Sequence, residues 1–146
     1  MNLFSKTISI RWADIDPNFH LRHSVYYDFG TQQRIEILEQ SGLTLNIMKE
    51  QGFGPVIFRE ECVFKREIKL SDTITITAKI SKLNADASRW TFKHEFFNSS
   101  NKLCAVLTLE GGWLDTNLRK LADPTPKIAI DVLNTFPKTI EYTEER

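Results

Sequence analysis

An acid-rich loop that leads into a helix is the stretch of this sequence best suited to chemistry. Asp14, Asp16, His20 and His23 lie close together there, and Pro17 directly follows the second aspartate. A carboxylate can act as a nucleophile or as a base for water. The N-terminus of a helix offers unpaired N–H groups that stabilise negative charge developing on a reacting oxygen. The two features together predict an active site in this loop.

The two aspartates have different expected roles. Asp16 precedes a proline, which favours extended backbone. A loop aspartate in this position is also typical of a turn or a helix cap, so from the residues alone both interpretations of Asp16 stay open. Asp14 lies two residues earlier and points the same way as Asp16 only if the strand continues. We therefore assign Asp14 a structural role.

A strand before the loop and a helix after it must position these side chains. Residues 7–12 alternate apolar and polar side chains, which predicts a half-buried strand that includes Trp12. Helical spacing begins after Ser24, a candidate N-cap, and ends at Gly42. The helix residues predicted to face the core are Tyr26, Phe29, Gly30, Ile37 and Leu38. Gly30 disfavours an isolated helix by about 1 kcal/mol relative to alanine, so we expect the helix to lie against a sheet there.

The second half of the chain is predicted to be mostly strand. The four strand-like runs are residues 56–70, 73–83, 88–98 and 103–114. The fourth run is almost continuously apolar, which indicates a central strand covered on both faces. In the second run Ile74, Ile76, Ala78 and Ile80 share one face. Short helices are expected over residues 43–51 and 128–136, the latter after two prolines.

This order of elements predicts an α+β chain. We expect an antiparallel sheet of about five strands wrapped around one long helix, with a short helix near the C-terminus. The 146 residues fit a single domain spanning 1–146. One helix covers only one face of such a sheet, so the uncovered face or edge needs a partner. A homodimer is the expected arrangement, and two dimers could pair as a homotetramer.

Composition narrows the function classes. Lysine plus arginine and aspartate plus glutamate number 19 each, so the formal net charge is zero and no nucleic-acid partner is expected. No stretch approaches the roughly 18 apolar residues of a membrane span, and no charged, apolar leader opens the chain; we expect no membrane span and a cytoplasmic location. Cys62 and Cys104 lie outside any metal-binding spacing, so both are expected as core thiols without a metal or redox cofactor.

The loop and the start of the helix resemble an enzyme signature. The segment WADIDPNFHLRHSVYYDF is similar to that of hot-dog-fold acyl-CoA thioesterases of the 4-hydroxybenzoyl-CoA thioesterase type, including the Tol-Pal-associated bacterial members. In that family an aspartate in a D-x-D-P or D-x-D-A context precedes a histidine-containing loop, and a tyrosine or phenylalanine follows ten residues on. Asp16, His20, His23 and Tyr26 fall in register with this pattern. The segment SDTITITAKI also resembles a family strand, so the likeness covers most of the chain.

The resemblance implies a hot-dog fold and hydrolysis of an acyl-CoA thioester to free acid and coenzyme A, which enters only as part of the substrate. It implies Asp16 as the catalytic nucleophile or base and the backbone N–H of His23 as the oxyanion donor; the His23 side chain could polarise the carbonyl or protonate the leaving thiolate. Tyr26, Phe19 and Arg22 are implied at substrate-binding positions. Relatives carry a small residue in place of Phe19 and an Asn-Asn pair in place of Arg22 and His23, so their acyl preference does not transfer.

Two other functions stay open. Hot-dog-fold enoyl hydratases carry D-x-N-P-x-H, which Asp14, Asp16, Pro17 and His20 nearly match, although the asparagine is absent and the histidine comes one residue late. The third possibility is a non-catalytic hot-dog domain that binds acyl-CoA or acyl carrier protein. Turnover of a thioester separates the first function from the third.

Polar groups on the predicted strands give two further hypotheses. His94 and Glu60 each interrupt an apolar face, so they could pair inside the sheet. Four basic residues on neighbouring strands could meet the phosphates of coenzyme A: Lys65, Arg66, Arg89 and Lys93.

Overall fold

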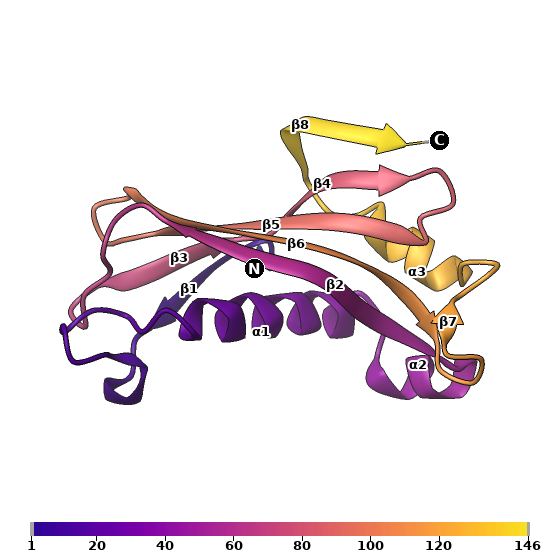
Figure 1. The fold of residues 1–146 in the computed structure, drawn as a ribbon, viewed down its shortest axis with the longest axis horizontal. Coiled ribbons are helices and arrows are strands. Elements are labelled where there is room, and N and C mark those ends of the chain that lie inside the picture. The colour runs from indigo at the N-terminus through magenta and orange to yellow at the C-terminus, as the bar shows by residue number, and fades with distance from the viewer. Residues whose placement is uncertain (1, 146) are drawn as a thin grey trace.

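A curved sheet lies over one long helix in the computed structural model, which describes residues 2–145 (Figure 1). The chain begins with β1 (Ser5–Ser9), the 3₁₀ turn η1 (Trp12–Asp14) and α1 (Val25–Gln40). The remaining elements are α2 (Leu45–Gln51), β2 (Phe53–Phe64), β3 (Thr73–Thr77), β4 (Lys79–Asn84), β5 (Arg89–Phe97), β6 (Leu103–Asp115), β7 (Lys120–Leu121), α3 (Lys127–Leu133) and β8 (Lys138–Glu145). This architecture confirms the predicted α+β fold.

The sheet is five strands wide over most of its area. β2, β6 and β5 are consecutive antiparallel neighbours. β3 and β4 pair with opposite ends of the far edge of β5, and β1 and β8 extend the sheet beyond them. The run predicted as one strand over residues 73–83 is divided at Ala78, whose N–H bonds to the Phe4 carbonyl at 2.9 Å. The predicted core face of that run is confirmed, because Ile74, Ile76 and Ile80 are buried.

α1 lies beneath the sheet and packs through the predicted stripe (Figure 1). Tyr26, Ile37 and Leu38 are buried, as expected, while Phe29 is only partly buried. At Gly30 the helix packs closely against β6: a Cβ there would stand 2.5 Å from Leu107 Cδ2. The expectation that the helix contacts a sheet at this glycine is confirmed.

The first strand ends earlier than predicted, at Ser9. Trp12 does not continue the half-buried strand as predicted, because the chain turns into η1 and leaves that side chain 74% exposed. Asp14 holds the turn: its fully buried carboxylate accepts hydrogen bonds from Arg11 N at 2.9 Å and Arg11 Nη2 at 2.7 Å. These bonds, led by the side-chain bond, lower the pKa of Asp14. The structural role expected for Asp14 agrees with this geometry.

β2 also differs from expectation. It stops at Phe64, because the N–H groups of Lys65 and Arg66 both donate to the Cys104 carbonyl, at 2.7 and 3.0 Å, and turn the chain. The apolar alternation of this run predicts one shared face that includes Phe58 and Phe64, but both side chains are about half exposed. A bulge between residues 57 and 59 shifts the register of β2 against β6. Among the described strands β2 pairs only with β6, so it is an edge strand.

β6 is central, as predicted, but it is covered on one face only. Leu107 and Leu109 are fully buried, whereas Thr108 is half-buried and Glu110 is exposed. The sequence reading placed no strand after the C-terminal helix, yet β8 pairs there in parallel with β4. Within residues 2–145 no helix combines the length and apolar character needed to cross a membrane.

Candidate active site

A tight turn holds the Asp16 carboxylate. Its Oδ1 accepts hydrogen bonds from the N–H groups of Asn18 at 2.8 Å and His20 at 3.2 Å. The Phe19 N–H donates to the Asp16 carbonyl at 3.0 Å and closes the turn. Within residues 2–145 no group donates a hydrogen bond to Oδ2. One carboxylate oxygen therefore organises the turn while the other is left for chemistry, so the two interpretations of Asp16 are compatible.

The loop is anchored at both sides. The Leu21 N–H donates to the Ile68 carbonyl at 2.8 Å, and His20 Nε2 lies 2.9 Å from Glu67 Oε2. On the other side the Arg22 N–H donates to the Asp14 carbonyl at 2.7 Å. These contacts hold the segment between η1 and the residues that follow β2, so the position of Asp16 is fixed from two directions.

The loop and the start of α1 share one open cleft of about 310 Å³. Its lining residues are Asp16, His20, Leu21, His23, Tyr26, Phe64, Lys65, Arg66 and Glu67. Tyr26 forms a rigid wall, because its ring packs edge-on against Phe64 and Phe96 with centroids 5.1 Å away in each case. Burial raises the pKa of Tyr26 well above its ordinary value, so its hydroxyl stays protonated.

Backbone N–H groups at the helix start face the same region. The first residue of α1, Val25, donates its N–H to the Arg22 carbonyl at 3.0 Å. The His23 N–H, two residues earlier, has no hydrogen-bond acceptor within the described chain. Ser24 occupies the predicted N-cap position, but the capping prediction is wrong for its side chain: Ser24 Oγ accepts from Arg22 Nε at 2.9 Å instead. The helix start is left with unpaired donors.

Two of the five predicted site residues lie outside this cleft. Arg22 is directed towards η1, where its Nη1 donates to the Ala13 carbonyl at 3.0 Å. Phe19 is 74% exposed and lines a neighbouring hollow with His20, Lys69 and Leu70. Its backbone has φ 65, in the left-handed region that bulky residues seldom adopt. The structure thus brings Asp16, His23 and Tyr26 together and sets Phe19 and Arg22 beside them.

The four basic residues do not form one group. Lys65 and Arg66 line the cleft. Arg89 lies over the Phe58 ring, 5.0 Å from its centroid, and Lys93 Nζ pairs with Glu141 at 2.6 Å. Only the first two are available near Asp16.

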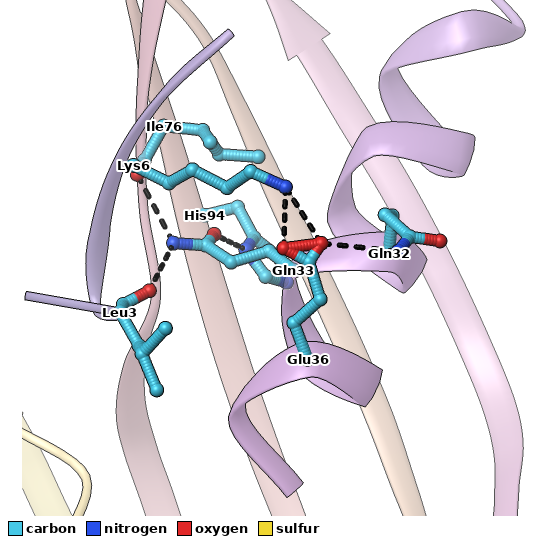
Figure 2. Close-up of polar contacts among 7 residues, drawn as sticks. All are labelled: Leu3, Lys6, Gln32, Gln33, Glu36, Ile76 and His94. Atoms are coloured by element: carbon cyan, nitrogen blue, oxygen red, sulfur yellow. Dashed lines mark hydrogen bonds and ion pairs between the residues drawn. The ribbon is translucent and has the colours of Figure 1, made fainter. Parts of the chain in front are cut away.

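A buried polar chain fastens α1 to the sheet away from the cleft (Figure 2). Gln33 Nε2 donates to the carbonyls of Leu3 and Ile76, each at 3.1 Å, and its Oε1 faces His94 Nδ1 at 2.9 Å. Figure 2 shows Gln33 between the imidazole and these two backbone oxygens. Because arginine can only donate, His94 Nε2, 3.0 Å from Arg34 Nη1, must be the acceptor, which leaves the proton on Nδ1.

The predicted pairing of His94 with Glu60 is wrong, because Arg34 lies between them. Arg34 Nη2 is 4.0 Å from Glu60 Oε2, and within the described residues that oxygen has no hydrogen-bond partner. Burial lowers the pKa of Arg34 to about 10, partly opposed by the Glu60 charge. The sequence reading missed Gln33 and Arg34, although they follow Gly30 by three and four residues on the face that meets the sheet.

A second cavity, of about 240 Å³, lies between the sheet and the C-terminal half of α1. Its lining residues are Thr31, Arg34, Ile35, Leu38, Pro55, Ile57, Trp90, Phe92, Trp113 and Phe136. The walls are apolar and aromatic apart from Thr31 and Arg34. It lies at the Pro55 end of β2, whereas the Asp16 cleft lies at the Phe64 end.

Comparison with known proteins decides the family. Residues 10–132 match the thioesterase-like superfamily. The chain belongs to this superfamily. No curated protein matches it significantly. The match covers the loop, α1 and all of the sheet except β1 and β8, so it includes the Asp16 cleft and every lining residue of the second cavity except Phe136.

Solved structures of the superfamily's fold are similar over nearly the whole chain. A hypothetical protein of Staphylococcus aureus in complex with CoA has a TM-score of 0.82 at 18% identity, covering 96% of this chain and 89% of its own. A 1,4-dihydroxy-2-naphthoyl-CoA thioesterase of Synechocystis has a TM-score of 0.79 at 19% identity, covering 90% and 96%. A probable thioesterase of Escherichia coli gives 0.79 at 18%, covering 91% and 98%. At these identities the likeness establishes the hot-dog fold.

Proposed function

We propose that this thioesterase-like chain hydrolyses an acyl-CoA thioester, with Asp16 as the nucleophile or as the base that activates water. The observation that carries the proposal is that the two oxygens of the Asp16 carboxylate have different surroundings. Two backbone N–H groups fix Oδ1, at 2.8 and 3.2 Å, and Oδ2 is unengaged within the described residues. A reactive oxygen held in a fixed direction is what attack on a thioester carbonyl requires.

The His23 N–H is the proposed oxyanion donor. It stands at the entrance to α1, where the helix dipole adds positive potential, and no protein acceptor within residues 2–145 competes for it. A donor of this kind typically stabilises the transition state by about 3 kcal/mol. The exposed His23 imidazole is then free to protonate the departing thiolate.

The rest of the cleft supports a coenzyme A thioester as substrate. Lys65 and Arg66 on its rim can pair with phosphate groups, and Tyr26 forms the wall beside Asp16. Phe19 projects from the same turn and could cover the pantetheine arm. We propose an acyl-CoA enzyme of the 4-hydroxybenzoyl-CoA thioesterase type on these grounds. The hydratase alternative would assign catalysis to His20, whose Nε2 lies 2.9 Å from Glu67 Oε2.

We also propose that two copies pair through β2 to form a homodimer. The outer edge of this twelve-residue strand has no partner among the described strands, and Ile57, Val63 and Phe64 on it are 42 to 51% exposed. Unprotected edges of this kind pair readily with another strand. Antiparallel pairing about a two-fold axis brings the Pro55 end of each β2 beside the Phe64 end of the other. The Asp16 cleft of one copy then adjoins the apolar cavity of its partner, which can receive the acyl group.

Thiol release from a series of acyl-CoAs tests the enzyme assignment. Asp16→Asn retains a side-chain oxygen for the N–H groups of Asn18 and His20, so the turn should persist. We expect kcat/KM to fall at least about a hundredfold with an unchanged circular dichroism spectrum. The matched control is Asp131→Asn on the exposed face of α3, which should leave turnover unchanged.

Turnover by Asp16→Asn at the wild-type rate would refute the catalytic role. Tight binding of an acyl-CoA with no thiol release by the wild type would instead establish the non-catalytic alternative. Hydration of crotonyl-CoA without thiol release would establish the hydratase.

A further inference from the structure

The apolar cavity between α1 and the sheet has a charged group on its wall. Arg34 is on its wall with only 11% of its side chain exposed. Its guanidinium makes two hydrogen bonds, to His94 Nε2 at 3.0 Å and to Thr31 Oγ1 at 3.1 Å. Arginine has more N–H donors than these two bonds use. The guanidinium therefore keeps N–H donors that no acceptor within residues 2–145 engages.

Two tryptophans on the cavity wall also have N–H donors without acceptors. Trp90 and Trp113 both line the cavity and are 4% and 1% exposed. Neither indole Nε1 has a hydrogen-bond acceptor within residues 2–145. Indole nitrogen can only donate. Among the side chains that line the cavity, the polar groups are therefore donors apart from the Thr31 hydroxyl, which already accepts from Arg34.

The charge nearby determines what kind of oxygen fits. Glu60 Oε2 lies 4.0 Å from Arg34 Nη2, so the guanidinium charge is already balanced, although no hydrogen bond joins the two groups. A second carboxylate would add an uncompensated negative charge in an apolar space. A hydroxyl, keto or ether oxygen would accept the spare N–H bonds without changing the net charge.

The cavity is also large enough for a sizeable occupant. An engineered apolar cavity of about 150 Å³ is known to bind benzene. The space between α1 and the sheet, at about 240 Å³, can hold a larger group, such as a medium-length acyl chain that carries one oxygen substituent.

We propose that Arg34 is a specificity-determining residue that selects acyl groups carrying an uncharged oxygen acceptor away from the thioester. The inference rests on the proposed thioesterase function for its substrate class, because the acyl group is what enters this cavity. It goes further in assigning a preference: oxygenated acyl chains are favoured over plain hydrocarbon chains of equal length. His94 positions the guanidinium from behind, through its Nε2.

Paired substrates test the preference. Thiol release is measured for plain acyl-CoAs and for ω-hydroxyacyl-CoAs of the same length, over a range of lengths. At the length that brings the hydroxyl to Arg34 we expect kcat/KM to favour the hydroxylated thioester about tenfold, which corresponds to about 1.4 kcal/mol. In Arg34→Met the ratio should fall to about one, while Arg119→Met, an exposed arginine in the turn after β6, should retain the wild-type ratio.

A binding measurement separates this inference from the proposed function. Cyclohexanol and cyclohexane are added at equal free concentration, and the thermal unfolding midpoint is recorded. Cyclohexanol should raise the midpoint of the wild type and of Arg119→Met more than cyclohexane does, and this difference should vanish in Arg34→Met. The wild-type comparison stands alone if Arg34→Met fails to fold.

The outcomes are distinct. Equal turnover of both thioesters at every length, with no preference for the alcohol, overturns the inference and leaves the thioesterase intact. A preference for the alcohol without any thioester hydrolysis overturns the proposed function and supports Arg34 as the oxygen-selecting residue of this cavity.

Discussion

His94→Gln should remove a large part of the acid sensitivity of this fold. The imidazole is fully buried on β5 and accepts a hydrogen bond from Arg34 at 3.0 Å. Protonation at Nε2 would break that bond and place two cations in contact. Burial, reinforced by the Arg34 charge and opposed by the Thr77 carbonyl, lowers the pKa of His94 to about 3. Glu60, beyond Arg34, lies too far to reverse this effect.

The sign and the magnitude follow from linkage. The histidine of the unfolded chain titrates near pH 6.5, so between about pH 6.5 and pH 3 the unfolded state binds one more proton than the native state. The free energy of unfolding therefore rises with pH across this window, by about 1.4 kcal/mol per pH unit. On acidification from about pH 6.5 to pH 4.5 the loss is roughly 2 kcal/mol, a large share of the about 5–15 kcal/mol typical of a domain.

Urea unfolding at a series of pH values measures this slope. Glutamine does not titrate, and its amide can still donate to Gln33 and accept from Arg34. We expect His94→Gln to be less stable than the wild type at neutral pH but to show a shallower pH dependence, by about 1.4 kcal/mol per unit. Carboxylates contribute equally to both proteins and cancel in the difference. Identical slopes for the two proteins would show that the imidazole is not held neutral by its surroundings.

Two further substitutions test the loop and the edge strand. Phe19→Gly and Phe19→Ala both remove an exposed ring, but only glycine relieves the left-handed φ of 65. The free energy of unfolding of Phe19→Gly should therefore be about 1 kcal/mol higher than that of Phe19→Ala. Equal urea midpoints would contradict this. Val63→Lys places a charge on the exposed face of β2 and should prevent two copies from pairing through this strand. Light scattering during size exclusion should then show a dimer for the wild type and a monomer for the variant. An unchanged dimer would locate the interface elsewhere.

The spacing of apolar residues predicted which helices and strands form better than it predicted the residues at which they end. The stripe on α1 and the faces of the central strands were readable because each alternation is set by local geometry. The strand that was expected to reach Leu70 stops at Phe64, since Lys65 and Arg66 are turned by one carbonyl on a distant strand. The first strand was overextended to Trp12 for a similar reason: the Arg11–Asp14 contact bends the chain. Neither contact leaves a periodic signal.

The candidate site was only partly predictable for the same physical reason. Asp16, His23 and Tyr26 belong to one contiguous segment, so their proximity could be inferred from the sequence. The Gln33 to His94 bond joins residues from different elements and could not. The apolar alternation of β2 also did not reveal which of its residues are buried, because several of its apolar side chains lie on the surface.

Gly30 leaves space for side chains that pack between α1 and the sheet. A methyl group there would press on Leu107 and stand 3.3 Å from both Arg34 Nη1 and His94 Cδ2. The missing side chain thus lets α1 lie close enough to the sheet for the guanidinium to reach the imidazole, and it sets the width of the space between them. A larger residue at this backbone position should widen that space, so redesign of the proposed acyl preference could begin there.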